Sequence, residues 1–171
     1  MKALDFSFII PVYNRPEEIE ELLGSFLNFD GDNTFEIVIV EDGSSDTSEH
    51  VVEKFQSKLD ISYYFKPNSG PGDSRNFGMH YYIILDSDVL MPSNYLMEVK
   101  TFLDKNYYDC FGGPDAAHSS FSNLQKAINF AMTSFITTGG IRGGKQKVED
   151  FQPRSFNMGL SKTAFLASEG F

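Results

Sequence analysis

The sequence predicts an α/β fold in which helices flank a mostly parallel β-sheet. Short, nearly continuous apolar runs at residues 6–12, 35–40 and 81–85 have the composition of strands that are buried on both faces. Amphipathic segments lie between these runs, and strand and helix alternate at intervals of roughly 30 residues. This alternation is typical of parallel βαβ units with right-handed crossovers.

The length and composition favour a single folded domain. The chain has 171 residues, which suits one domain with a sizeable core. Hydrophobic residues make up 41% and charged residues 22%, so the composition is that of a globular protein. We therefore expect most of its 17 phenylalanines to lie in the core.

The first unit is a strand at residues 6–12 followed by a helix that begins at Pro16. Asn14 is expected to cap this helix, with Glu17 three residues on as the partner in a capping box. Apolar residues recur at helical spacing on one predicted face, at Ile19, Leu22, Leu23, Phe26 and Leu27.

The second unit is a strand at 35–40 followed by a helix whose start Asp46 and Glu49 can box. The inward face of this helix is expected to carry Val51, Val52, Phe55 and Leu59. Further strands are predicted at 61–65, 81–85, 107–111 and 156–160, and further helices after Pro92 as far as about Leu103, at 121–135 and at 161–168.

Polar residues follow three of the predicted strands at their carboxyl ends. These segments are Tyr13-Asn14-Arg15, Glu41-Asp42-Gly43 and Asp86-Ser87-Asp88. Ligands of open α/β sheets bind beyond the carboxyl ends of the strands. The sequence therefore predicts a ligand site with carboxylates on one rim of the sheet.

Asp86 and Asp88 are the candidate metal ligands. Their carboxylates lie one residue apart after a buried strand, and oxygen ligands suit hard cations such as Mg²⁺ or Mn²⁺. A cation there would bridge two phosphates and stabilise a leaving nucleoside diphosphate. The alternative is a solvated turn, in which Asp and Ser are common. The apolar strand before the triplet and the second acidic rim position favour the metal site.

Asp42 and Arg75 are candidates for contact with a nucleotide. A carboxylate at position 42 can accept hydrogen bonds from a base N–H or a ribose hydroxyl, while Ser45 or Asp46 caps the next helix. Arg75 lies in the Gly/Ser-rich loop 68–76, where it either meets a diphosphate or base, or pairs with a rim carboxylate. This loop lacks the Gly-Lys-Ser/Thr ending of a P-loop.

The net charge of −10 argues against nucleic acid as a partner, because such binding depends on Lys and Arg neutralising phosphates. The three histidines lack zinc-site spacing. The lone Cys110 is expected to be a small buried apolar residue. With neither a signal-peptide pattern nor an apolar run near the ~20 residues of a membrane span, a cytoplasmic location is expected.

Four ordered motifs resemble those of family 2 glycosyltransferases of the GT-A fold. They are residues 7–15 (SFIIPVYNR), 38–46 (VIVEDGSSD), 68–78 (NSGPGDSRNFG) and 84–88 (ILDSD), and residues 154–159 and 169–171 resemble the acceptor-side segment. The resemblance spans nearly the whole chain. It implies one GT-A domain over residues 1–171, with a nucleotide-binding half at 1–91 and an acceptor-side half at 92–171.

The resemblance implies transfer of a sugar from a nucleotide-sugar, usually a UDP-sugar, with inversion, to a glycan or lipid-linked acceptor. Carried over by motif, the nucleotide-sugar site comprises Pro11, Tyr13, Asn14, Asp42, Arg75, Asp86 and Ser87, and Asp88 with Asp86 would hold Mn²⁺ or Mg²⁺. Peripheral association at the inner face of the cytoplasmic membrane is expected through a C-terminal part beyond Phe171. The alternatives are a non-catalytic nucleotide-sugar-binding module and a nucleotidyltransferase.

The catalytic base of this family stands shortly after its Gly-Phe segment, and the sequence stops at Phe171. The base is therefore expected beyond that residue, with Asp115 and Glu149 as fallback candidates. The family also has a longer helix where this sequence has residues 78–81. At 78–81 and at 143–147, two explanations stay open: a true deletion relative to the family, or residues missing from this sequence.

Overall fold

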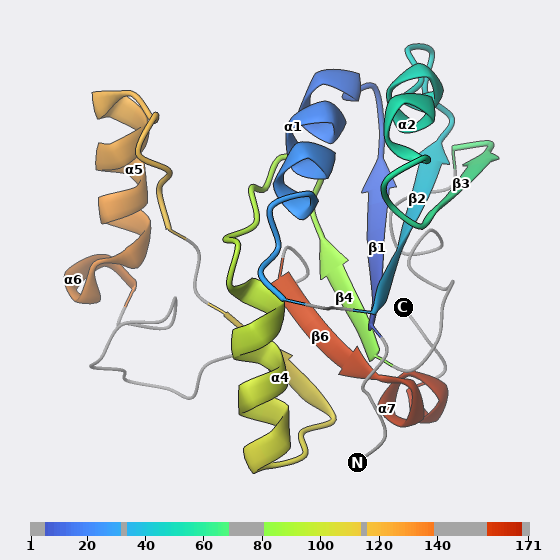
Figure 1. Cartoon of the computed structure of the whole chain (residues 1–171). Coiled ribbons are helices and arrows are strands. Elements are labelled where there is room, and N and C mark those ends of the chain that lie inside the picture. Colours follow the sequence, from blue (N-terminus) through green and yellow to red (C-terminus); the bar gives the residue numbers. More distant parts are fainter. Residues whose placement is uncertain (1–5, 32–33, 69–80, 114–115, 139–156, 169–171) are drawn as a thin grey trace.

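The structure, a computed structural model, describes residues 6–31, 34–68, 81–113, 116–138 and 157–168. Within those ranges the centre is a six-stranded sheet in the order β3-β2-β1-β4-β6-β5 (Figure 1). Its strands are β1 (Phe6–Val12), β2 (Phe35–Asp42), β3 (Ile61–Lys66), β4 (Tyr81–Leu85), β5 (Cys110–Gly112) and β6 (Asn157–Ser161). The helices are α1 (Pro16–Phe26), α2 (Glu49–Phe55), α4 (Tyr95–Lys105), α5 (Asn123–Thr133), α6 (Phe135–Thr138) and α7 (Lys162–Ala167).

The sheet is mostly parallel, as predicted. Strand β1 pairs in parallel with both β2 and β4, and β2 pairs in parallel with β3. Strand β6 runs the other way between β4 and β5, so it adds two antiparallel pairings that apolar content alone does not reveal.

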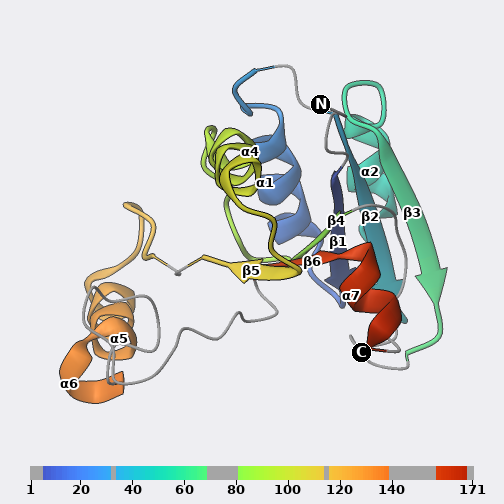
Figure 2. The ribbon, with the colours of Figure 1, turned by 90° about the horizontal axis from the view of Figure 1, so that it is seen from below.

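Helices cover both faces of the sheet. The larger core lies under α1, α2 and α4, whose residues Leu22, Val52 and Leu96 pack with the inward side chains of β1, β2 and β4. On the other face, Phe165 of α7 packs against a smaller cluster that includes Tyr82. Figure 2 shows α1 and α4 on one side of β6 and α7 on the other.

Phenylalanines fill much of the larger core, but the expectation that most of them lie there is met only in part, because Phe65, Phe102, Phe121, Phe130 and Phe135 are exposed. The rings of Phe8, Phe26, Phe29 and Phe35 contact one another with centroids 4.7–6.1 Å apart, mostly edge to face. Aromatic pairs favour this arrangement because the positive ring edge meets the negative face. Leu27, which was expected on the buried face of α1, is exposed beyond the last turn.

Both predicted N-caps in the first half are wrong. The N-cap of α1 is Arg15 and that of α2 is Ser48, and neither side chain makes a capping hydrogen bond. Asn14 has a left-handed backbone with φ of 52° and directs its side chain toward the loop after β2. That tertiary contact takes the oxygen that a helix cap would have used.

Two expectations in the second half also need correction, the burial of Cys110 and the single helix at 121–135. Cys110 is exposed, not buried, because β5 is a three-residue strand at the sheet edge. Phe102 is half exposed and stacks on Tyr108. The helix predicted at 121–135 is divided into α5 and α6, which stand apart from the sheet in Figure 1.

None of the described helices is both long and apolar enough to cross a bilayer.

Gly159 of β6 is required by close packing rather than by its backbone angles. A Cβ placed there would lie 2.0 Å from the ring of Phe111, which is buried on the neighbouring strand. We expect Gly159→Ala to lower the free energy of unfolding by about 1–3 kcal/mol, because the ring must leave its packed position. Thermal denaturation measures this effect.

Gly24→Ala is the matched control, since a Cβ on this α1 residue meets nothing within 4 Å. It should stabilise the protein by about 0.4–1 kcal/mol by restricting the unfolded chain. Equal stability changes for the two substitutions would contradict the packing argument.

Candidate functional site

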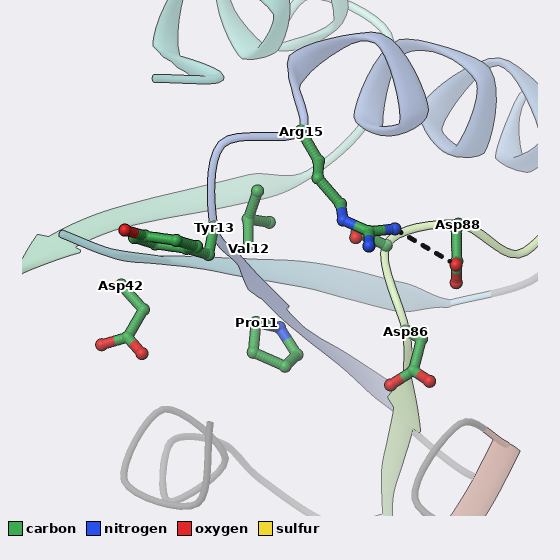
Figure 3. A pocket seen from close by; sticks show the side chains of 8 residues that line it. Pro11, Val12, Tyr13, Arg15, Asp42, Asp86 and Asp88 are labelled. Carbon is green, nitrogen blue, oxygen red and sulfur yellow. Dashed lines mark hydrogen bonds and ion pairs between the residues drawn. The ribbon is translucent and has the colours of Figure 1, made fainter. Parts of the chain in front are cut away.

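The candidate site lies where three parallel strands end on one rim of the sheet. Parallel pairing places the ends of β1, β2 and β4 side by side. A pocket of about 400 Å³ opens there (Figure 3). It is lined by Pro11, Val12, Tyr13, Arg15, Asp42, Asp86, Ser87 and Asp88. Six of the predicted site residues, from three separate motifs, therefore meet around one cavity.

The pocket has two chemically different ends. Asp42 lies on one side of Pro11, and Asp86 and Asp88 lie on the other (Figure 3). Tyr13 is 53% exposed, and its side chain lies at the Asp42 end of the pocket, where it is accessible to a planar ligand group. Exposed aromatic rings of this kind stack on nucleobases.

Asp42 is the last residue of β2, whereas the sequence predicted that it lies in the loop after this strand. The strand runs two residues further than predicted, so the carboxylate is held by sheet pairing. Gly43 then turns the chain away with φ of 74°, and a Cβ there would lie 2.6 Å from the backbone nitrogen of Asn68. Only glycine fits both the backbone angle and this approach.

The acidic end combines two carboxylates with one arginine. Arg15 Nη1 donates to Asp88 Oδ2 at 3.2 Å and lies 3.8 Å from Glu18 Oε1 (Figure 3). The Asp88 side chain is 56% exposed, so this ion pair is weak and can exchange with a ligand. Arg15 was named among the rim residues but not among the predicted site residues. Within the described pocket lining, Arg15 supplies the guanidinium group.

The residues of the acidic end fit a magnesium or manganese ion that also binds a diphosphate. Such ions typically take one or two protein carboxylates and complete their coordination with phosphate oxygens and water. Asp86 and Asp88 supply the two carboxylates. Among the described residues there is no group of three or more His, Cys, Asp or Glu side chains that could hold a metal by themselves. The fit therefore depends on oxygens from the ligand.

Asn14 lies beside the pocket lining and joins the two loops that form it. Its Oδ1 accepts from Ser45 N at 2.8 Å, from Ser45 Oγ at 3.1 Å and from Asp46 N at 3.0 Å. Its backbone nitrogen donates to Ser44 Oγ at 2.8 Å. The predicted contact with the nucleotide stays a prediction, and the structure gives Asn14 an additional role in fixing the loops.

Glu41 is the buried anchor of the same loops and was missed as a functional residue. Its side chain is fully buried and accepts from Ser44 Oγ, from Ser48 N at 2.9 Å and from Tyr63 Oη at 3.2 Å. Burial and then the charge of Glu41 raise the pKa of the Tyr63 hydroxyl, which keeps this donor protonated. The available signal was an acidic residue continuing a buried apolar strand.

Several predicted residues lie outside the described ranges. They are Arg75, the fallback bases Asp115 and Glu149, residues 78–80 of the short spacing at 78–81, and residues 143–147. Their roles stay predictions.

Comparisons with known proteins agree with the geometry of the rim. The model of the family described as Glycosyl transferase family 2 matches residues 7–164. The poly(ribitol-phosphate) beta-N-acetylglucosaminyltransferase TarS of Staphylococcus aureus is 33% identical over 114 residues, which are 62% of this chain and 20% of TarS. The minor teichoic acid biosynthesis protein GgaB of Bacillus subtilis is 33% identical over 110 residues, 60% of this chain and 12% of GgaB. The chain thus spans a fifth or less of these curated relatives.

Solved structures show the same architecture. The crystal structure of S. aureus TarS 1-349 in complex with UDP-GlcNAc has a TM-score of 0.63 and 31% identity, covering 70% of this chain and 36% of that one. A mannosyltransferase from Pyrobaculum calidifontis, solved with GDP-Man and Mn²⁺, has a TM-score of 0.69 at 16% identity and covers 97% of this chain and 47% of that one. The second likeness concerns the fold alone.

The predicted α/β fold of the GT-A type is confirmed by these neighbours. The family model matches most of its length, and six of the predicted site residues lie on one rim, so the chain is a member of glycosyl transferase family 2.

Proposed function

We propose that the protein transfers a sugar from a UDP-sugar to a glycan or lipid-linked acceptor, with inversion. The observation that carries the proposal is the pocket with two different ends. At one end the carboxylate of Asp42, a hydrogen-bond acceptor, lies near the aromatic ring of Tyr13, and at the other end lie the two carboxylates of Asp86 and Asp88. A nucleoside diphosphate has matching ends, since its base offers N–H donors and its phosphates need a cation. The TarS structure with UDP-GlcNAc supports a uridine donor.

The residues of the pocket would divide the work between binding and charge. Tyr13 would stack on the base, while Asp42 would accept a hydrogen bond from it. Asp86 and Asp88 would hold Mn²⁺ or Mg²⁺, which when bound neutralises charge on the leaving diphosphate. Arg15 would exchange Asp88 for a phosphate oxygen, since guanidinium groups bind both.

Inversion needs a base that deprotonates the acceptor hydroxyl for in-line attack. We also propose that a lipid-linked acceptor brings the protein to the inner face of the cytoplasmic membrane. Fractionation of cells that produce the full-length protein tests that location, and recovery only with the soluble fraction would contradict it.

The donor prediction is that UDP binds at least ten times more tightly with Mn²⁺ than without it. The reason is that Asp86 and Asp88 repel a diphosphate until a cation lies between them. Calorimetric titration of UDP, with and without Mn²⁺ and after EDTA treatment, measures this ratio. Equal affinities in all three conditions would contradict a metal-dependent site.

Hydrolysis of a panel of nucleotide-sugars by the full-length protein tests the reaction. We expect turnover with a hexose or N-acetylhexosamine donor carried by UDP, and none with GDP-mannose. UDP binding without turnover of any donor would replace the proposed enzyme with a nucleotide-sugar-binding module.

A further inference from the structure

Lys66 stands beside the base end of the pocket without lining it. In the parallel register of β2 and β3, Asp42 and Lys66 are direct partners at the carboxyl ends of their strands. Lys66 Nζ lies 2.5 Å from Asp42 Oδ1. Strand pairing therefore brings a cation against a carboxylate that forms part of the pocket wall.

This ion pair is far less exposed than others in the structure. The side chains of Lys66 and Asp42 are 18% and 7% exposed. Those of the pairs Arg15–Asp88, Arg15–Glu18 and Lys54–Glu20 are 38% to 56% exposed. Solvent screens exposed pairs, whereas a charge removed from water depends strongly on its partner. The negative charge of Asp42 is therefore balanced within the protein by Lys66.

A charge partner inside the protein changes what Asp42 can recognise. A carboxylate kept ionised is only an acceptor, so the ligand atom it meets must carry a proton. Because Lys66 already balances its charge, Asp42 suits a neutral N–H group rather than a second cation. The metal end differs, since there the arginine contact is exposed and exchangeable.

We propose that Lys66 is a positioning residue for nucleobase recognition: it balances the charge of Asp42 and orients this carboxylate to accept the imide N–H of uracil. The proposal rests on the proposed function of the pocket. Lys66 acts through Asp42 and requires no contact of its own with the nucleotide. Its effect should appear at the base and be absent at the diphosphate.

A double-mutant cycle in the full-length protein tests this coupling, with UDP and Mn²⁺-pyrophosphate as calorimetric probes. We expect Lys66→Met to weaken UDP about tenfold, the usual size for loss of one charged hydrogen bond, and to leave pyrophosphate unchanged. In an Asp42→Asn background the same substitution should change UDP affinity less than twofold. Lys66→Arg should retain most of the affinity.

Lys54→Met is the matched control, because it removes a lysine from an exposed ion pair between α2 and α1. It should leave UDP affinity unchanged. If Lys66→Met fails to fold, Lys66→Gln replaces it in the test, because glutamine keeps a hydrogen-bond donor without the charge. The double variant, Lys66→Met with Asp42→Asn, leaves neither member of the ion pair charged. We expect Lys66→Gln to weaken UDP at least threefold.

Three results would overturn the inference. These are unchanged UDP affinity in the folded Lys66→Met and Lys66→Gln variants, an equal loss for pyrophosphate, and an equal loss in the Asp42→Asn background. Each of them is compatible with UDP binding by the wild-type protein, so the proposed function would survive. Absence of UDP binding by the wild-type protein would overturn both.

Discussion

Asp88→Asn is expected to reduce the turnover of a UDP-sugar by about 1000-fold. The substitution keeps the shape of the side chain and one oxygen, but it removes the charge that would bind a divalent cation at the acidic end of the pocket. Charge stabilisation of a leaving group by a metal contributes several kcal/mol to the barrier, which is the basis of this magnitude. The Mn²⁺-dependent part of UDP affinity should fall by about 100-fold.

Steady-state kinetics and calorimetry of the full-length variant measure these two effects. Asp104→Asn is the control, because Asp104 is an exposed carboxylate on α4 that takes no part in the pocket. Its kinetics should match the wild type. Asp88→Asn with wild-type turnover and undiminished Mn²⁺ dependence would remove Asp88 from the metal site.

Glu41→Gln is expected to cost about 2–4 kcal/mol in the free energy of unfolding and to weaken UDP binding in the fraction that stays folded. Glu41 accepts hydrogen bonds from Ser44, Ser48 and Tyr63 in a fully buried position. An amide turns one acceptor into a donor, so at least one buried donor loses its partner. The loop that carries Asn14 should then loosen, since Ser44 also binds the backbone of Asn14.

Urea denaturation gives the stability change, and UDP titration at low temperature gives the change in affinity. Glu36→Gln serves as the control on the same strand, where Glu36 accepts from Ser7 Oγ at 2.6 Å at the far end from the pocket. It should cost less than about 1.5 kcal/mol and leave UDP affinity unchanged. If Glu41→Gln lowered stability but left UDP affinity intact, Glu41 would be a packing residue without influence on the pocket.

The strands and the acidic rim were predictable because their signals are local. A continuous apolar run identifies a buried strand, and the topology of parallel sheets requires that the residues after such strands share one edge. The bounds of β1 and β4 agree with the prediction, and so does the meeting of Tyr13, Asp42 and Asp86 around one pocket.

The caps and the second half were less predictable because neighbours in space decide them. Asn14 has the sequence position of a helix cap, yet three donors from the loop after β2 take its side-chain oxygen. The exposure of Cys110 follows from its place on an edge strand, and the antiparallel direction of β6 follows from how the chain returns to β4. Neither is encoded in the spacing of apolar residues.

The sequence by itself determined the fold class, the family and the two acidic segments on the rim of the sheet, since each depends on residue order and periodicity. The tertiary structure alone decided which charges stand together. Lys66 meets Asp42, Arg15 meets Asp88, and Glu41 holds the loop of Asn14 through Ser44. The pairs Lys66–Asp42, Arg15–Asp88 and Asn14–Ser44 are 24, 73 and 30 residues apart in the chain. Strand register and loop geometry bring them together, and electrostatic interaction depends on distance in space rather than along the sequence.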